Sequence, residues 1–485
     1  MDDLLAARLQ MAVSLGFHIV FAMIGIAMPV LMVLAEARWI RTGSEVARRL
    51  AKSWAKGTAI FFAVGAVSGT VLSIELGLLW PAFMEHAGGI IGLPFGLEGF
   101  AFFTEGIFLG VYLYAWDRIP KRAHLASGII VAISGALSAV FIIMVNAWMN
   151  TPEGFQFDPA TGIFSDIDPL EAMITPHWAH QFVHQLLAAY ASVGFAVAGV
   201  HAFGLLRDRA SRFHREALGL AMTMALPAAL LVPVTGHWAA QEVAERQPAK
   251  LAAMEGQFET ESRAPLRIGG IPFEDEARTR WAIEIPGALS FLAFNDLDAV
   301  VTGLDAFPRD EWPPVAIVHF AFQVMVACGT VMAAVAVWWA LGAWRAHRAG
   351  RSPIGEAPAR PMLFALMACA PLGFIAIEAG WTVTEVGRQP WIIYGVMRTA
   401  DAVSPMPGLV VPFVTFSLIY VALAFFVTAL MVRQFRLAAE IEAQGGVPPG
   451  PGGGSGGAYE SDGSDGPVGS DGADEAGMPV PEGVR

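Results

Sequence analysis

The chain has 485 residues, of which 55% are hydrophobic and only 15% are charged, and its mean hydropathy is positive. Soluble globular proteins are about 25% charged, so this composition excludes an ordinary soluble enzyme and indicates a chain that spans a membrane. The formal net charge of −13 does not describe that membrane part, because the segment from Gly445 onward supplies −6 of it through seven acidic residues and one arginine.

Apolar stretches that reach the roughly 20 residues needed to cross a bilayer recur along the chain. The first, residues 9–35, carries one histidine and no other ionisable side chain. It is too long for the core of a signal peptide, so we predict a retained helix. The predicted fold is all-α, a polytopic membrane protein of about nine transmembrane helices. The predicted spans are residues 9–35, 54–83, 92–116, 124–149, 178–206, 214–240, 313–344, 362–384 and 407–435.

The segments between these spans alternate between two kinds. One kind is rich in arginine and lysine, and the other is acidic or mixed. Short basic loops stay on the cytoplasmic side of a membrane, so we expect the N-terminus outside and the C-terminus in the cytoplasm. The basic segments are residues 38–52, 118–122, 207–215, 345–360 and 433–436.

Four regions follow from this pattern. Residues 1–240 hold helices one to six, and residues 313–436 hold helices seven to nine. Between them, residues 241–312 form an outer loop that is too long for a simple connector, which indicates a function. Residues 437–485 form an acidic tail rich in Gly, Pro and Ser, which cannot bury a core and is predicted to be disordered.

Ionisable side chains inside apolar spans are costly and are therefore functional candidates. From the predicted orientation, most of them lie in the outer half of the membrane. A methionine in the same region is added to the set because its thioether is a soft metal ligand. The candidates are His18, Glu75, Glu98, Glu105, His184, His201, Met325, Glu378 and Glu385, of which His201 is predicted to be an interfacial residue near the basic inner side.

An outer-half cluster of imidazole, thioether and carboxylate suits iron porphyrins. A His/Met pair gives a six-coordinate, low-spin electron carrier, whereas a single histidine or a weak carboxylate leaves haem iron able to bind dioxygen. Each residue alone has a simpler interpretation as a packed or hydrogen-bonded core residue. The cluster, and no single member of it, favours haem. Glu98 and Glu105 are seven residues apart and share one helix face, which is typical of a proton relay, and a pair of structural hydrogen-bonding carboxyls is the alternative.

Several strings carry a resemblance to a known family: LGFHIVFAMIGIAMP, GLPFGLEGFAFFTEGIF, VNAWMNTPEGF, WAHQFVHQLLAAY, KLAAMEG, FQVMVACGT and GWTVTEVGRQPW. Together they resemble subunit I of the cytochrome bd family of quinol oxidases, in one register from residue 1 to about residue 436. The KLAAMEG and GWTVTEVGRQPW strings are the most specific of these.

The resemblance implies roles for particular residues. His184 and Met325 match the axial ligands of a low-spin b haem, and His18 and Glu378 match the axial ligands of two high-spin haems. Glu98 and Glu105 match carboxylates implicated in proton delivery. Residues of the outer loop match the quinol-binding positions, and one arginine after the eighth span would pair with a haem propionate or be structural. The loop residues are Gln247, Lys250 and Glu255, and the arginine is Arg388.

The resemblance also implies an activity and an assembly. We expect a quinol:oxygen oxidoreductase that oxidises quinol at the outer face and reduces dioxygen to water, building a proton gradient without pumping. The expected cofactors are two b-type haems, one low-spin and one high-spin, and one haem d or a third b haem in its place. The expected partners are a second polytopic subunit, a small single-span subunit, quinol, dioxygen and the bilayer of the bacterial inner membrane. No nucleic-acid-binding pattern is present.

Three features depart from one well-known branch of the family. Gln323 stands two residues before the methionine where that branch has arginine, a further acid, Glu75, stands in SIELGLLWP where that branch differs, and residues 241–312 lack a long insertion. The chain therefore resembles the short-loop branch, and the string VTEVGRQPWIIYGVMRTADAVS is similar to that of cyanide-insensitive members. Two rival classes remain weaker: a haem-bearing anchor for a soluble dehydrogenase would need paired histidines, and a haem-free transporter would leave Met325 unexplained.

Overall fold

The computed structural model describes residues 1–158, 163–175, 178–350 and 357–443, which belong to one compact unit. Within these residues, nine helical segments are long and apolar enough to cross a membrane, as the sequence predicts. They are α1 (Asp3–Thr42), α2 (Glu45–Leu79), α3 (Pro81–Tyr114), α4 (Lys121–Asn150), α6 (Trp178–Arg207), α7 (Arg212–Arg246), α10 (Val315–Arg348), α11 (Arg360–Cys369) with α12 (Leu372–Val386), and α14 (Val410–Ala443).

Several helices extend beyond their predicted apolar spans because polar caps carry them further. At the start of α1, the Asp2 carboxylate accepts a hydrogen bond from the Leu5 N–H at 2.7 Å. At its other end, Gly43 adopts a positive φ of 69°, where a side chain would be strained, and Ser44 then caps α2. Helix α14 continues to Ala443, past the predicted start of the acidic tail at residue 437, and residues 444–485 of that tail lie outside the described residues.

The predicted span 362–384 is interrupted. Helix α11 ends at Cys369 and α12 begins at Leu372, because Pro371 has no N–H to donate to the preceding turn. The break lies close to α6: a Cβ built on Gly373 would come within 2.4 Å of Ser192 Cα, so only glycine allows this approach.

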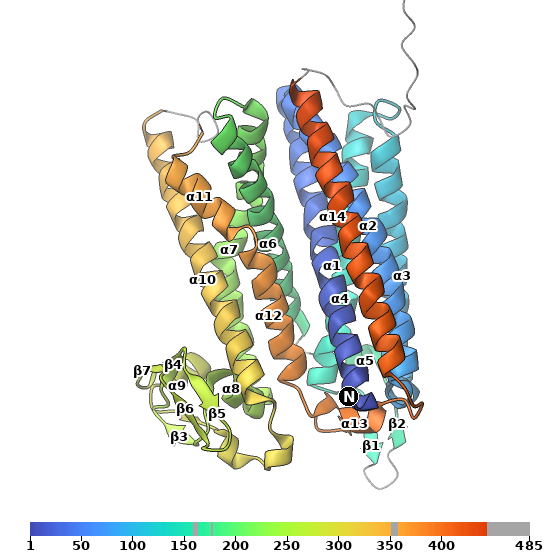
Figure 1. Cartoon of the computed structure of the whole chain (residues 1–485), viewed down its shortest axis with the longest axis vertical. Helices are drawn as coiled ribbons and strands as arrows, with labels where there is room; N and C mark the ends of the chain where they lie inside the picture. Colours follow the sequence, from blue (N-terminus) through green and yellow to red (C-terminus); the bar gives the residue numbers. More distant parts are fainter. Residues whose placement is uncertain (159–162, 176–177, 351–356, 444–485) are drawn as a thin grey trace, which may run out of the picture. The chain divides into compact units, whose positions relative to one another are not determined.

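The helices form two groups that pack side by side (Figure 1). The first group consists of α1–α4 and α14, and the second consists of α6, α7, α10, α11 and α12. One buried apolar cluster, with Leu31 and Leu50, lies mainly in the first group and extends to Val193 and Leu220 of the second, and another, with Phe195 and Leu218, lies within the second group. Contacts of α1 with α6, α7 and α12 join the groups.

The two ends of the helix groups differ. The loop end carries the N-terminus, the short helices α5 (Pro169–Met173), α8 (Pro248–Glu255), α9 (Ala288–Phe294) and α13 (Thr399–Ala402), and all the strands (Figure 1). Within the part of the chain that the structure describes, the strands form five two-stranded antiparallel pairs. These pairs are β1 (Gln156–Asp158) with β2 (Ile163–Ser165), β3 (Glu261–Ser262) with β8 (Val300–Val301), β4 (Leu266–Ile268) with β7 (Ile283–Ile285), β5 (Ile271–Phe273) with β6 (Arg278–Arg280), and β9 (Trp391–Ile393) with β10 (Met397–Arg398).

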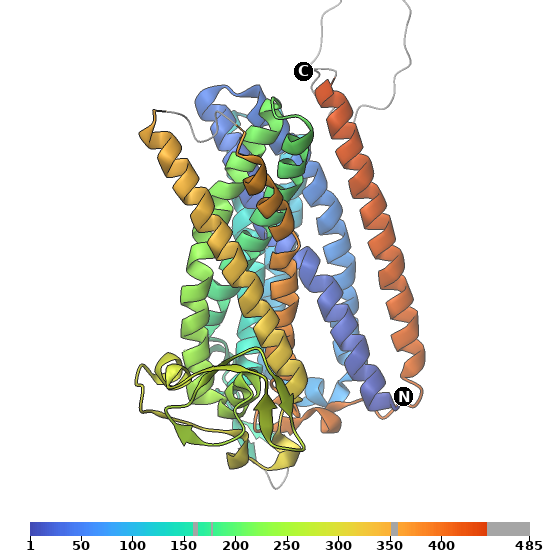
Figure 2. The same ribbon diagram turned by 60° about the vertical axis from the view of Figure 1, so that its left-hand side comes forward.

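Most of the predicted outer loop is ordered at this end. Helix α7 runs on to Arg246, and the chain then forms α8, α9 and the strands β3–β8, followed by two 3₁₀ turns, Leu304–Ala306 and Arg309–Glu311. Figure 2 shows these strands gathered below α7 and α10. Contacts of α8 with α7 and α10 seat the loop on the second helix group.

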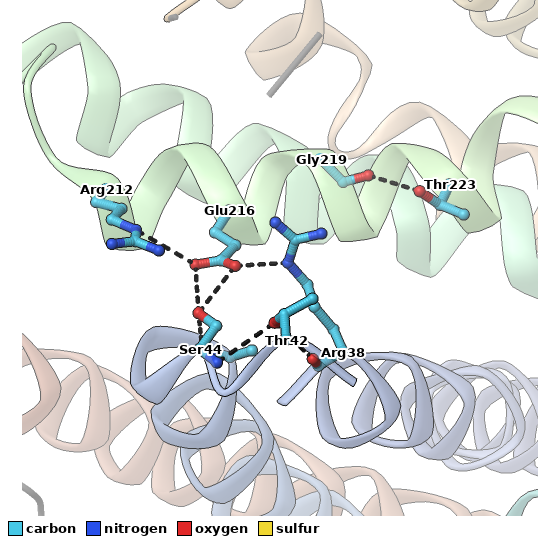
Figure 3. A network of polar contacts seen from close by, with 8 residues as sticks. Arg38, Thr42, Ser44, Arg212, Glu216, Gly219 and Thr223 are labelled. Carbon is cyan, nitrogen blue, oxygen red and sulfur yellow. Dashed lines mark hydrogen bonds and ion pairs between the residues drawn. The ribbon is translucent and has the colours of Figure 1, made fainter. Parts of the chain in front are cut away.

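At the opposite, basic end, a buried carboxylate joins the two helix groups. Glu216 of α7 is 3% exposed, and it accepts hydrogen bonds from Arg38 Nε of α1 at 2.5 Å and from the Ser44 hydroxyl at 3.0 Å (Figure 3). Arg212 lies 3.9 Å away from the same carboxylate and is exposed. The α1–α2 turn is therefore fixed to the start of α7 by the contacts of Arg38 and Ser44, whereas the weak contact of Arg212 lies within α7 itself.

Replacement of Glu216 by alanine leaves the Arg38 and Ser44 donors without their acceptor. We expect the Glu216→Ala variant to lose about 2 kcal/mol of unfolding free energy, since charge-assisted hydrogen bonds to buried groups contribute about that much. The measurement is a denaturant titration of the purified protein. Arg212→Ala serves as the matched control, with a change below about 0.5 kcal/mol. Equal effects of the two substitutions would contradict the assignment.

Candidate functional site

His18 of α1 is held through one ring nitrogen. Its Nδ1 lies 2.9 Å from the Ser68 hydroxyl of α2. That hydroxyl points its own proton to the carbonyls of its helix, at 2.9 Å to Val64 and 3.1 Å to Gly65. A hydroxyl has one proton, so it accepts from Nδ1–H, and the Nε2 lone pair of His18 is left for a ligand.

His184 of α6 is held in the same way. Its Nδ1 lies 3.0 Å from the Thr235 hydroxyl of α7, and that hydroxyl donates to the Val232 carbonyl at 3.1 Å. The Nε2 lone pair of His184 is again left for a ligand. Both histidines are half-buried between helices, one in each helix group.

Met325 and Glu378 complete the predicted ligand set. Met325 lies on α10, and Glu378 lies on α12, where its Oε1 atom is buried without a hydrogen-bond partner. A Cβ built on Gly16 of α1 would come within 3.1 Å of Glu378 Oε2. Glu378 therefore lies where the two helix groups meet, whereas Met325 lies within the second group.

The four predicted ligands share one local feature, a glycine on a neighbouring helix that faces the end of the side chain. A Cβ on that glycine would come within 3.0–3.2 Å of an imidazole carbon, a thioether sulfur or a carboxylate oxygen. The glycines therefore leave room at each ligand. The pairs are His18 with Gly69, His184 with Gly236, Met325 with Gly380 and Glu378 with Gly16.

This donor set fits haem iron. Neutral imidazole, thioether and carboxylate are all donors suited to haem iron, and each donor here packs against a glycine of a neighbouring helix. Arg388 supports the fit from the loop end. It is 3% exposed, and its Nε and Nη1 atoms have no hydrogen-bond partner, so it can meet an anionic group such as a propionate.

The predicted proton-transfer pair lies on α3 in the first helix group. Glu98 is half-buried and accepts a hydrogen bond from the Ser138 hydroxyl at 2.8 Å. Glu105 is only 5% exposed and lies against Gly135 of α4 and Gly25 of α1. The two carboxyls share one face of α3, with Glu105 nearer the basic end.

Glu75 belongs to a separate buried polar cluster on the first helix group. Its Oε1 accepts a hydrogen bond from Gln10 Nε2 at 2.9 Å. Ser14 lies beside both Glu75 and Tyr420, and all four side chains are at most 3% exposed. Ser14 is one helical turn from His18, toward the loop end.

Two of the three predicted quinol-binding residues, Gln247 and Lys250, contact α4 at the loop end, whereas Glu255 lies at the other end of α8 near Arg267. Lys250 Nζ donates to Asn150 Oδ1 at 2.6 Å, and Gln247 Nε2 donates to the Asn150 carbonyl at 2.6 Å. Asn150 in turn donates to the Asn146 carbonyl at 2.8 Å. Sequence reasoning did not single out either asparagine, although both stand in the VNAWMN string, four residues apart on one helix face.

The polar chain continues from α4 to α12. Asn146 Nδ2 donates to Glu385 Oε1 at 2.5 Å, and Arg388 Nη2 donates to Glu385 Oε2 at 2.6 Å. Lys250 of the loop is thereby connected through two asparagines to the carboxylate that holds Arg388.

A cavity of about 130 Å³ lies beside Lys250. Aromatic and apolar side chains from the turn before α10 and from the β9 segment line it, with Gln389 and Glu311 as further polar groups. Such a mixture of aromatic walls and a few polar groups is typical of a small-molecule site. The aromatic and apolar lining residues include Phe307, Pro313, Trp391 and Tyr394.

Two titratable groups of α8 lie outside the membrane-spanning helices and are fully buried. Burial lowers the pKa of Lys250 to about 7, and the nearby Arg388 guanidinium acts in the same direction. Burial raises the pKa of Glu255 to about 8, opposed by Arg267. Both groups therefore change protonation close to neutral pH.

Gln323, the departure noted in the sequence, holds the loop. Its Oε1 accepts from the Gly269 N–H at 3.1 Å, and its Nε2 donates to the Arg267 carbonyl at 3.0 Å. His319, one turn earlier on α10, contacts the Met254 carbonyl at 2.8 Å through Nδ1. The helix that carries Met325 is thus bonded to the loop that carries Lys250 and Glu255.

A family model, two curated relatives and a solved structure that match the chain all belong to one family. The family described as "Cytochrome bd terminal oxidase subunit I" matches residues 6–439. A Bacillus subtilis protein described as a cytochrome bd menaquinol oxidase subunit I is 39% identical over 441 residues, covering 90% of this chain and 97% of the relative. The Bacillus subtilis cytochrome bd ubiquinol oxidase subunit 1 is 31% identical, covering 92% and 97%. The solved bd oxidase from Geobacillus thermodenitrificans matches with a TM-score of 0.83 at 41% identity, covering 90% of this chain and 98% of that chain.

Proposed function

The chain belongs to the cytochrome bd terminal oxidase subunit I family, and we propose that it oxidises a membrane quinol beside α8 and delivers the electrons to haem, where dioxygen is reduced to water. It is a quinol:oxygen oxidoreductase of the bacterial inner membrane, which it crosses several times. The observation that carries the proposal is the set of four donors, each facing a glycine across a helix interface.

The proposed haem ligands divide between the helix groups. His184 and Met325 would hold a low-spin b haem. His18 and Glu378 would each serve a high-spin haem, one of type b and one of type d or b. Haem iron supplies one-electron transfer and, where an axial position is open, dioxygen binding. The protein's part is to hold neutral imidazoles, a thioether and a carboxylate in place, and to offer Arg388 to a propionate.

The proposed quinol site is the cavity beside Lys250. The aromatic rings of Trp391 and Tyr394 offer stacking surfaces for a flat head group, and Lys250 and Gln389 offer polar contacts. Gln247 and Asn150 support Lys250 from the inner side. The relatives are named for menaquinol and ubiquinol, so the substrate class is a quinol.

The proposed first acceptors of the quinol protons are two buried side chains of α8. Neutral Lys250 and ionised Glu255 accept protons, and both forms become available close to neutral pH. Asn150 and Asn146 connect Lys250 to Glu385, which fixes Arg388. One hydrogen-bonded chain thus connects Lys250 at the proposed quinol site with Arg388, which is proposed to bind a propionate.

The proposed orientation places the N-terminus and the loop end outside and the basic end in the cytoplasm. The protons consumed in dioxygen reduction then pass from the cytoplasm along Glu105 and Glu98, while quinol protons leave on the outer side. Each charge moved across the whole membrane stores about 2.3 kcal/mol per 100 mV. A proton gradient therefore forms without pumping.

The proposed roles can be assigned to regions of the chain. Residues 1–240 and 313–436 form the haem-binding helices, and residues 241–312 form the quinol-binding loop. The relatives are named as subunit I or subunit 1 of an oxidase, so we propose a second polytopic subunit as partner, together with a small single-span subunit.

The first test is a reduced-minus-oxidised absorption spectrum of the purified complex, repeated with carbon monoxide. We expect a carbon-monoxide-sensitive haem, with a far-red band if haem d is present and only b-type bands if a third b haem replaces it. The Met325→Leu variant loses the sulfur ligand and should convert the low-spin haem to a five-coordinate form. Intact complex without any haem signal would refute the proposal.

The pH dependence of quinol oxidation provides a second test. As the pH rises from below about 7 to above about 8, Lys250 loses its proton and Glu255 becomes ionised, so both gain the ability to accept a quinol proton. We therefore expect kcat/KM for quinol to rise across this range. Lys250→Met should remove the increase in kcat/KM near pH 7, and Glu255→Gln should remove the increase near pH 8. Reduction of the haems by dithionite should be unchanged in both variants. Profiles that are unaltered in both variants would exclude this role.

A further inference from the structure

The two proposed imidazole ligands face similar tripeptides on different helices, valine followed by a hydroxyl residue and glycine. His18 of α1 lies against Val67-Ser68-Gly69 of α2, and His184 of α6 lies against Val234-Thr235-Gly236 of α7. In both places the hydroxyl residue contacts Nδ1, and the glycine after it faces the ring carbon Cε1. The arrangement therefore occurs twice, on helix pairs that belong to different groups.

The hydrogen-bond directions agree at both places. Ser68 and Thr235 each donate to carbonyls one turn earlier in their own helices, so each can only accept from the imidazole. The carbonyls of Gly65 and Val232 also lie within hydrogen-bonding range of the respective rings. At Nδ1 itself the acceptor is the hydroxyl, and it selects the Nδ1–H tautomer of each ring.

The glycines set the position of the rings. A Cβ on Gly69 would lie 3.0 Å from His18 Cε1, and one on Gly236 would lie 3.2 Å from His184 Cε1. Such distances are tighter than ordinary contacts, so any larger residue would push the imidazole away from its hydroxyl. The hydroxyl and the glycine therefore act on the same ring from the same helix turn.

We propose that Ser68 and Thr235 are positioning residues, each of which fixes the tautomer and ring orientation of its histidine so that Nε2 is presented to haem iron. This inference rests on the proposed function, because it requires His18 and His184 to be ligands. A donated Nδ1–H bond also makes an imidazole a stronger donor to iron, which favours the ferric state. The two hydroxyls therefore influence both the retention and the potential of their haems.

The test uses Ser68→Ala and Thr235→Val in the purified complex. We expect Ser68→Ala to release the haem at His18 about ten-fold more readily to apomyoglobin, the low end of such effects because the Gly65 carbonyl remains. We expect Thr235→Val to raise the midpoint potential of the low-spin haem. Each variant should leave the other haem's spectrum as in the parent, which also shows that the protein is folded.

Matched controls separate positioning from packing. Ser127 stands in a Ser-Gly dipeptide on α4, and Thr223 lies on α7, and both hydroxyls bond to carbonyls of their own helices without contact to a proposed ligand. Ser127→Ala and Thr223→Val should match the parent in haem retention and potential. The conservative variants Ser68→Thr and Thr235→Ser should restore the parent values.

The outcomes distinguish a failure of the positioning role of Ser68 and Thr235 from a failure of the ligand role of His18 and His184. If Ser68→Ala and Thr235→Val match the parent and the controls in retention, spectrum and potential, the positioning role is refuted. If His18→Ala or His184→Ala retains its haem with an unaltered spectrum, the proposed ligand itself is wrong, and the proposed function must be revised at that site.

Discussion

The structure depends on one constraint of the bilayer: a polar side chain inside an apolar helix needs a polar partner within the protein. Most such groups find one on a neighbouring helix, as His18 does at Ser68 and Glu98 does at Ser138. Other buried polar atoms have no hydrogen-bond partner in the protein. Glu378 Oε1 and two nitrogens of Arg388 are among them, at positions proposed to meet a cofactor, and so is Glu75 Oε2 in the separate polar cluster.

The sequence predicted the helical architecture well because hydropathy measures the property that the bilayer selects. Nine spans were expected, and the described residues contain nine candidate helices. Helix ends were less predictable, since α1 and α14 continue beyond their apolar stretches through caps and polar turns. The break at Pro371 could have been expected from the missing N–H, but the close approach to Ser192 of α6 that accompanies it depends on packing between distant segments.

His18, His184 and Glu378 could be proposed as ligands from the sequence because ionisable side chains are unusual in apolar spans, whereas Met325 was proposed for its soft sulfur and through the family resemblance. Their supporting residues could not. Serine, threonine and asparagine are common in helices, and nothing local distinguishes Asn150 from another amide near a helix end. Its role becomes visible only when α8, α4 and α12 are brought together, so that one side chain meets both Lys250 and the chain toward Glu385.

The arrangement of α10 and α12 explains how the loop and the helices form one functional unit. Helix α10 carries Met325 and, two residues earlier, Gln323, which is bonded to the loop backbone. Helix α12 carries Glu378 and, two turns later, Glu385, which closes the polar chain from Lys250. A displacement of the loop would therefore act on both ligand-bearing helices. Because each ligand faces a glycine at close range, small helix movements would change its position directly, so the loop geometry and the ligand geometry are constrained together.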